Sequence, residues 1–101
     1  MKTFADLQFK PNPTALMGGI VARMTFDNGY SVSVIRNEYS YGGRDGLYEL
    51  AMMNADCSKL IYCDIVNNDV CGYLKPRDVT KLMRKIQKAK PNEYPKDDEG
   101  A

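Results

Sequence analysis

Apolar and polar residues alternate along two neighbouring stretches of the chain, residues 20–26 and residues 30–36. A period of two is typical of β-strands that bury one face. The pair Asn28-Gly29 separates the two stretches. Asn-Gly between alternating runs is the strongest short hairpin signal, because a type I′ turn needs positive φ at both central residues. The pattern therefore predicts a β-hairpin, with Tyr30 on the face that enters the core.

Two further stretches, residues 47–54 and 59–65, are rich in apolar residues and predict a third and a fourth strand. No connection between the four strands is long enough for a helical crossover, which favours an antiparallel meander. Residues 70–74 predict one short helical turn, capped by Asn68 or Asp69.

The clearest helix signal begins at Pro76, because proline suits the first helical position, where no backbone N–H is needed. Apolar residues then recur at the spacing of one helical face, and these are Val79, Leu82, Met83 and Ile86. Pro91 ends the helix. The predicted fold class is therefore α+β: a small antiparallel four-stranded β-meander with one C-terminal α-helix packed on one face.

The chain of 101 residues, 44% of them hydrophobic, suits one small globular domain. We divide it into an extended N-terminal arm (residues 1–18, with a helical turn at 4–7), a single α+β domain (19–90) and a disordered charged tail (91–101). One short helix covers only one face of the sheet. We expect the other face to be solvated, paired in a homodimer or covered by the arm.

The formal net charge of +1 conceals an uneven distribution. Residues 75–90 carry seven basic residues and one acidic residue, whereas residues 91–101 carry one basic and four acidic residues. Five basic residues face away from the apolar side of the helix and are candidate phosphate contacts: Arg77, Lys81, Arg84, Lys85 and Lys88. The alternatives are a solvated helix face, or a basic face that the acidic tail neutralises.

Histidine is absent, which excludes imidazole as a catalytic base or a metal ligand. Cys57, Cys63 and Cys71 form no C-x-x-C pair, and the first residues lack the apolar region of a secretory signal, so we expect free thiols in a reducing cytoplasm. No apolar run is long enough to span a membrane. No compact carboxylate pair and no serine with a nearby base is apparent. We therefore expect no catalytic residues, no metal, no cofactor and no enzymatic activity.

The most distinctive segment is the glycine-rich loop at residues 39–46, YSYGGRDG. Tyrosines offer stacking surface with a polar tip, arginine offers a forked hydrogen-bond donor, and glycines expose backbone N–H groups. Six loop residues are candidate partner-binding residues: Tyr39, Tyr41, Gly42, Gly43, Arg44 and Asp45. Such a loop suits a protein partner, a phosphate or a nucleotide. The alternative is a mobile strand connection whose glycines serve turn geometry.

Three segments resemble a set of small, mostly uncharacterised proteins encoded by tailed bacteriophages and prophages: NGYSVSVIR at residues 28–36, YGG at 41–43 and GLYELA at 46–51. The resemblance covers about residues 18–86, and the chain departs from the set in its cysteines and its charged tail. The resemblance implies a phage protein in the cytoplasm of a bacterial host, and it carries no catalytic residues. Small phage proteins commonly bind and block host enzymes or antiviral defence machines, including CRISPR effectors.

The leading hypothesis is a non-catalytic phage protein that inhibits a host or antiviral-defence protein, as an anti-CRISPR inhibitor does. The glycine-rich loop and the exposed sheet face would make the contacts. One alternative is a nucleic-acid-binding protein that uses the basic helix. Another is a sponge for a nucleotide signal, in which the loops and tyrosines of two subunits enclose the nucleotide. A virion assembly protein is a further alternative, and no membrane partner is expected.

Overall fold

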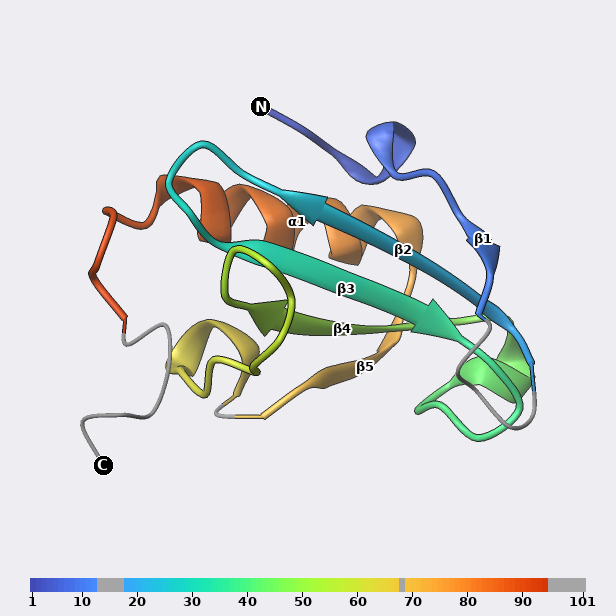
Figure 1. The fold of residues 1–101 in the computed structure, drawn as a ribbon. Coiled ribbons are helices and arrows are strands. Elements are labelled where there is room, and N and C mark those ends of the chain that lie inside the picture. Colours follow the sequence, from blue (N-terminus) through green and yellow to red (C-terminus); the bar gives the residue numbers. More distant parts are fainter. Residues whose placement is uncertain (13–17, 68, 95–101) are drawn as a thin grey trace.

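The computed structural model describes residues 1–12, 18–67 and 69–94, which form one antiparallel sheet with one α-helix on one side of it (Figure 1). The strands follow the chain order β1-β2-β3-β4-β5 across the sheet. Their bounds are Lys10–Pro11, Ile20–Thr25, Ser31–Arg36, Tyr48–Met53 and Cys71–Leu74, and the helix α1 spans Pro76–Lys88. The predicted α+β class and C-terminal helix are confirmed, but the described residues hold five strands rather than four.

The β2–β3 hairpin forms at the predicted position, but the predicted type I′ turn is wrong, because Gly29 has a φ of +88° whereas Asn28 does not have a positive φ. The Gly29 N–H donates to the Phe26 carbonyl at 3.0 Å, so Asp27 and Asn28 are the central residues of the turn and Gly29 follows them. The backbone N–H of Phe26 donates to the Tyr30 carbonyl at 2.8 Å, and Tyr30 is fully buried, as predicted. The Asn28 amide donates to the carbonyls of Ile86 (2.8 Å) and Ala89 (2.9 Å) at the C-terminal end of α1. The turn thus also satisfies carbonyls that a helix end leaves without intrahelical partners.

The predicted strand at residues 59–65 is wrong. Leu60 forms an isolated bridge to Met53, and the chain then turns into the 3-10 helix η3 at Asp64–Val66. This turn brings Val66 into the core, where its side chain is fully buried. Full burial of such a side chain stabilises by about 1.5–3 kcal/mol, which exceeds the net gain from one or two more ladder hydrogen bonds.

The short helical turn predicted at residues 70–74 is also wrong, because these residues form β5 beside β4. Cys71 pairs with Leu50, and both side chains are buried in the core. Packing against a neighbouring strand here outweighs the local capping signal. Of the two predicted caps, Asn68 lies outside the described residues.

The N-terminal arm lies against one edge of the sheet. The predicted helical turn is the 3-10 helix η1 at Phe4–Asp6, and β1 supplies the additional strand by pairing with β2. Phe4 and Phe9 pack against Tyr48, with ring centroids 5.1 Å and 5.3 Å away, and Leu7 is buried. Residues 13–17 of the predicted arm and 95–101 of the predicted tail lie outside the described residues.

α1 packs on one face of the sheet through Val79, Met83 and Ile86, which are fully buried. We call the opposite side of the sheet the open face. Its side chains come from paired positions on three strands: Val21, Arg23 and Thr25; Ser31, Ser33 and Ile35; Glu49, Ala51 and Met53. All of these except Val21 and Ser31 are at least partly exposed.

Candidate functional site

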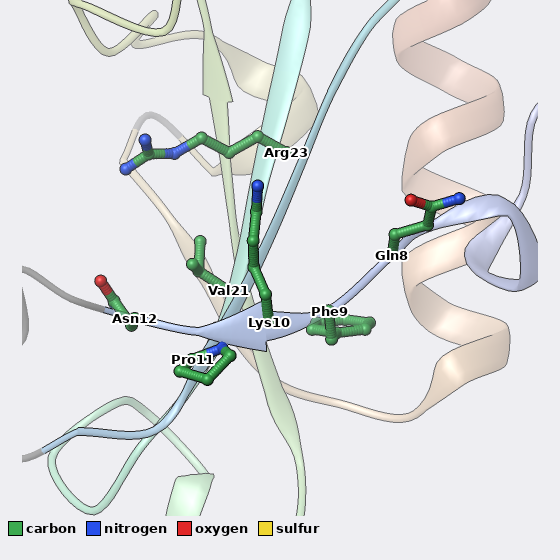
Figure 2. Close-up of a pocket in the computed structure, with 7 residues that line it drawn as sticks. All are labelled: Gln8, Phe9, Lys10, Pro11, Asn12, Val21 and Arg23. Atoms are coloured by element: carbon green, nitrogen blue, oxygen red, sulfur yellow. The ribbon is translucent and has the colours of Figure 1, made fainter.

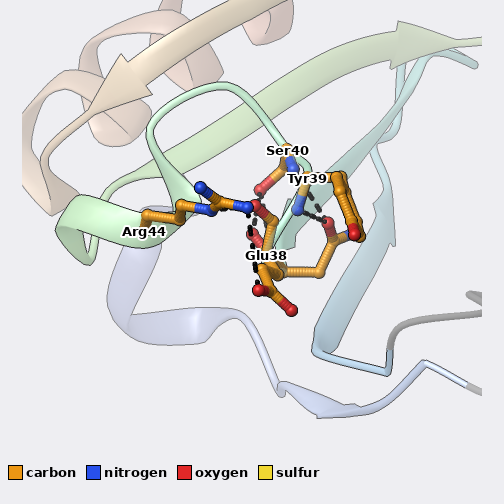
Figure 3. A network of polar contacts seen from close by, with 5 residues as sticks. Glu38, Tyr39, Ser40 and Arg44 are labelled. Carbon is orange, nitrogen blue, oxygen red and sulfur yellow. Dashed lines mark hydrogen bonds and ion pairs between the residues drawn. The ribbon is translucent and has the colours of Figure 1, made fainter.

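The glycine-rich loop between β3 and β4 is tied by its own hydrogen bonds. Asn37 Oδ1 accepts from the backbone N–H groups of Tyr39 and Ser40, both at 2.8 Å, and Ser40 Oγ accepts from the Asn37 N–H at 2.9 Å. Arg44 Nε donates to the Glu38 carbonyl at 3.2 Å, and the guanidinium lies 3.7 Å from the Glu38 carboxylate (Figure 3). The loop therefore presents its side chains from a hydrogen-bonded backbone.

Gly42 and Gly43 serve the geometry of the loop. Gly42 is buried with a φ of +86°, and a Cβ at Gly43 would overlap the Asn37 carbonyl. Four backbone N–H groups donate to carbonyls within the loop, those of Gly43, Asp45, Gly46 and Leu47. The prediction that the glycines offer N–H groups to a partner is therefore wrong for Gly43, and Gly42 is covered by other residues.

Three of the predicted partner-binding residues carry large exposed side chains. Tyr39 is 67% exposed and Tyr41 is 59% exposed. The side chain of Arg44 is 70% exposed, and its guanidinium lies 5.9 Å from the centre of the Tyr39 ring. Asp45 is also exposed, within the 3-10 helix η2 at Gly43–Asp45. The loop thus brings two aromatic rings and one cation to the surface.

Tyr73 of β5 joins these side chains, and sequence reasoning missed it. Its N–H donates to the Tyr41 carbonyl at 3.1 Å, and the Tyr41 N–H donates to Glu49 Oε1 at 2.9 Å. Tyr73 is 62% exposed and has a φ of +57°, where the β4–β5 register shifts. A β-bulge re-aims a side chain in this way, and the glycine at position 72 is the sequence signal that could have indicated it. We call Tyr39, Tyr41, Arg44 and Tyr73 the tyrosine surface.

The three cysteines lie among the described residues, and two of them, Cys63 and Cys71, are buried. No group of three His, Cys, Asp or Glu residues in the part of the chain that the structure describes could hold a metal ion. Cys57, Cys63 and Cys71 are free thiols. Burial raises the pKa of the Cys71 thiol, against a smaller opposing effect of the Lys85 charge. The neutral, unreactive form of that thiol is therefore favoured.

The five predicted phosphate contacts of α1 are all exposed, and they line a groove of about 780 Å³ along the helix. Across residues 1–12, 18–67 and 69–94, none of the five cations lies within 4.0 Å of a carboxylate oxygen. The neighbouring Asp78 instead accepts the Lys75 N–H at 2.9 Å, at the start of the helix.

In the described part of the chain, no helix has the length and apolar character needed to cross a membrane.

The chain was compared with protein-family models, with curated proteins and with solved structures, and nothing matches. The likeness to small phage proteins therefore stays a prediction from the sequence. Function has to be inferred from the surfaces of the molecule itself.

Proposed function

We propose that this protein acts without catalysis, by binding a protein partner through the tyrosine surface. Tyrosine and arginine are among the residues that contribute most to binding energy at protein interfaces. Three exposed tyrosines and Arg44 come from one loop and the strand beside it: the Tyr39 ring is beside the guanidinium, and the Tyr41 carbonyl accepts the Tyr73 N–H. Each tyrosine offers a large contact area at a low cost in side-chain entropy.

The backbone of Tyr73 is the observation that carries the proposal. A left-handed conformation at a non-glycine residue costs about 1–2 kcal/mol. Tyr73 holds a φ of +57° while the residue remains 62% exposed. Burial within this chain does not offset that strain, because most of the surface of Tyr73 is in water. Strained residues of this kind cluster at binding sites, where the strain fixes the direction of a functional side chain.

The hydrogen bonds of the loop also support binding. Asn37 and Ser40 hold the backbone around Tyr39, and Glu49 holds the backbone of Tyr41. Because these hydrogen bonds already order the loop before it binds, less conformational entropy is lost on binding. The tyrosine surface is therefore suited to a partner that fits it without rearrangement of the loop.

The class of partner comes from the sequence resemblance rather than from geometry. In this proposal the partner is a host protein or an antiviral-defence protein of a bacterium, and occupation of its surface inhibits it. Inhibition of a bacterial host or defence protein depends on the phage origin of this chain, whereas binding through the tyrosine surface does not.

Site-specific photo-crosslinking tests the binding surface. We would place p-benzoylphenylalanine at position 41 or 73, irradiate cells that produce the variant and identify the covalent adducts. We expect the same adduct from both positions, and none from the same change at Lys81, which lies on α1 behind the other face of the sheet. Different adducts at 41 and 73, or the same adduct at 81, would contradict a shared binding surface.

Affinity for the identified partner gives the second measurement. We expect the Tyr41→Ala/Tyr73→Ala double variant to bind at least about 100-fold more weakly, because each binding hot spot contributes about 2 kcal/mol or more. The matched Tyr41→Phe/Tyr73→Phe variant keeps both rings and should bind within a few-fold of the wild type. Wild-type affinity in the alanine variant would refute the proposal.

The basic groove of α1 supports a second candidate, in which the helix contacts nucleic-acid phosphates. The observation that favours it is the set of five exposed cations, none of which has a carboxylate oxygen within 4.0 Å in the described residues. The affinity for a DNA duplex should then fall steeply between 50 and 200 mM salt, by about tenfold for every two phosphates contacted. Lys81→Gln/Arg84→Gln should lower that salt dependence. Absence of binding at the lower salt concentration would exclude this candidate.

A further inference from the structure

A cleft opens at the edge of the open face, where the N-terminal arm leaves β2. β1 pairs with β2 only at Lys10–Val21 and Pro11–Ile20, so β2 runs on past the short strand. The cleft between them has a volume of about 520 Å³. The residues around it include Gln8, Lys10, Asn12, Val21 and Arg23 (Figure 2).

Two cations reach this cleft from neighbouring strands. Lys10 pairs with Val21, so Lys10 and Arg23 are diagonal neighbours on the same face of the sheet. Figure 2 shows Lys10 rising from β1 toward the side chain of Arg23. Both side chains are exposed, and neither has a carboxylate oxygen within 4.0 Å among the described residues. Two like charges thus share one small region without a neutralising group in that part of the chain.

The open face does not supply the missing anion. Its acidic residue, Glu49, pairs with Ile35, which pairs with Val21, so Glu49 lies two strands away from the cleft. Two strand spacings are about 10 Å. The Glu49 carboxylate is also engaged, because it accepts the Tyr41 N–H. The charges of Lys10 and Arg23 are therefore available to an anionic ligand.

We infer that this cleft binds the phosphate group of a phosphate monoester, with Lys10 and Arg23 as its charged contacts. Two cations balance a phosphate dianion, whereas a single carboxylate would leave one positive charge uncompensated. The guanidinium fork matches two phosphate oxygens, and the lysine ammonium supplies a point charge for a third.

The cleft has room for more than a phosphate ion. A volume of about 520 Å³ falls in the range of small-molecule sites. Val21 also lines the cleft, on the same face of the sheet as the two cations, although it is only 6% exposed. This site is independent of the tyrosine surface. It also differs from the nucleotide site predicted at the glycine-rich loop, where the N–H groups of Gly43 and Gly46 donate within the loop.

Titration of the full chain, followed by amide NMR signals, tests this inference. The probes are inorganic phosphate, adenosine 5′-monophosphate, adenosine and acetate. We expect the two phosphate compounds to shift the signals of residues 8–12 and 21–23 to saturation. Adenosine and acetate should bind at least about tenfold more weakly, because they lack the dianionic group.

Two variants test whether Lys10 and Arg23 contribute to the binding free energy. Lys10→Gln and Arg23→Gln should each weaken binding of adenosine 5′-monophosphate about tenfold, as expected for one charge-assisted hydrogen bond at an exposed site. Lys90→Gln is the matched control, because it removes the same charge from an exposed lysine that lines neither this cleft nor the groove of α1, and it should change the affinity less than twofold. Both cleft side chains are exposed, so a native spectrum is expected, and either variant alone suffices if the other fails to fold.

Three results would overturn the inference. The first is the absence of a saturable shift up to about 10 mM of either phosphate compound. The second is acetate binding as tight as phosphate binding. The third is equal weakening by Lys90→Gln, which would indicate general attraction of anions to a basic surface.

Discussion

Replacement of Gly72 by alanine tests whether the close packing of Tyr41 against Gly72 holds the loop beside β5. A Cβ at position 72 would overlap the Cβ of Tyr41 and lie 3.2 Å from the Tyr41 carbonyl oxygen. That oxygen accepts the Tyr73 N–H, and the Tyr41 N–H is bound to Glu49. Because the Cβ of Tyr41 is attached directly to the backbone and is not the end of a flexible side chain, the added methyl group must displace Tyr41 from β5.

The expected loss of stability has two parts. Overpacking by one methyl group costs about 1–3 kcal/mol. The two hydrogen bonds of Tyr41 are worth about 0.5 kcal/mol each, at the low end of the usual range because they are near solvent. The methyl group also buries some apolar surface, which offsets part of the loss. We therefore expect the free energy of unfolding to fall by about 2 kcal/mol and the melting temperature to fall by roughly 10 °C.

Urea denaturation measures this loss, and Gly46→Ala is the matched control. The control adds the same atoms at a φ of +76° with open space around them, so it should cost only about 1 kcal/mol of left-handed strain. Crosslinking from position 41 should be lost in Gly72→Ala and retained in Gly46→Ala. A Gly72→Ala protein with wild-type stability and unchanged NMR signals for residues 39–44 would refute this account of the spacing between loop and strand.

Three further substitutions probe the rest of the fold. Asn28→Ala should destabilise the protein by about 1–2 kcal/mol in thermal unfolding, because the amide that binds the last carbonyls of α1 is lost; an unchanged melting temperature would show that water replaces it without loss. Met83→Ala should cost about 2–5 kcal/mol, since Met83 is fully buried, and a smaller loss would indicate that the core collapses around the cavity. Burial, with a smaller effect of the Asp64 charge, raises the pKa of Tyr94 to about 12. The protonated phenol is thus favoured in the folded state. Its contribution to the free energy of unfolding is therefore present below about pH 10 and lost as the pH rises toward 12. Tyr94→Phe should lack that alkaline loss in denaturation curves, and parallel pH dependences of the two proteins would contradict the prediction.

The hairpin and the helix could be predicted because their signals are local. Gly29 supplies the positive φ that the turn needs, although the turn is not the predicted type I′, and Pro76 marks the start of α1 through its fixed φ. The apolar spacing that ends at Ile86 then selects the buried face. Each of these signals operates within one turn or one strand, and each is found in the structure where the pattern predicts it.

The edge of the sheet beside β4 could not be predicted in this way. Residues 59–65 and 70–74 are both short and apolar, so either could lie beside β4. The outcome depends on which packing buries more apolar surface: Val66 reaches the core only if the chain turns away after Leu60, and Cys71 then pairs with Leu50. That comparison is between non-local contacts, which residue periodicity does not contain.

Composition indicates only part of the proposed binding surface. Tyr39, Tyr41 and Arg44 were predicted because aromatic and guanidinium groups in a loop are typical of contact residues. Tyr73 joins them only because a loop residue packs over a glycine that lies about 30 positions further along the chain. The cleft at Lys10 is equally non-local, since it exists only where β1 is shorter than β2.

The cleft and the tyrosine surface lie at the two ends of one cross-strand row on the open face. Pairing across β1 to β4 defines the row: Lys10, Val21, Ile35 and Glu49. Glu49 in turn holds the Tyr41 N–H. Three strand spacings span roughly 14 Å, whereas an ordinary interface covers about 800 Å² of each partner, a patch roughly 28 Å across. A protein bound over the open face would therefore cover both ends of the row. We expect saturating adenosine 5′-monophosphate to weaken partner binding, and we expect Arg23→Gln to remove that competition. Partner binding that phosphate leaves unchanged would mean that the partner approaches the tyrosine surface from beyond β5 and leaves the cleft open.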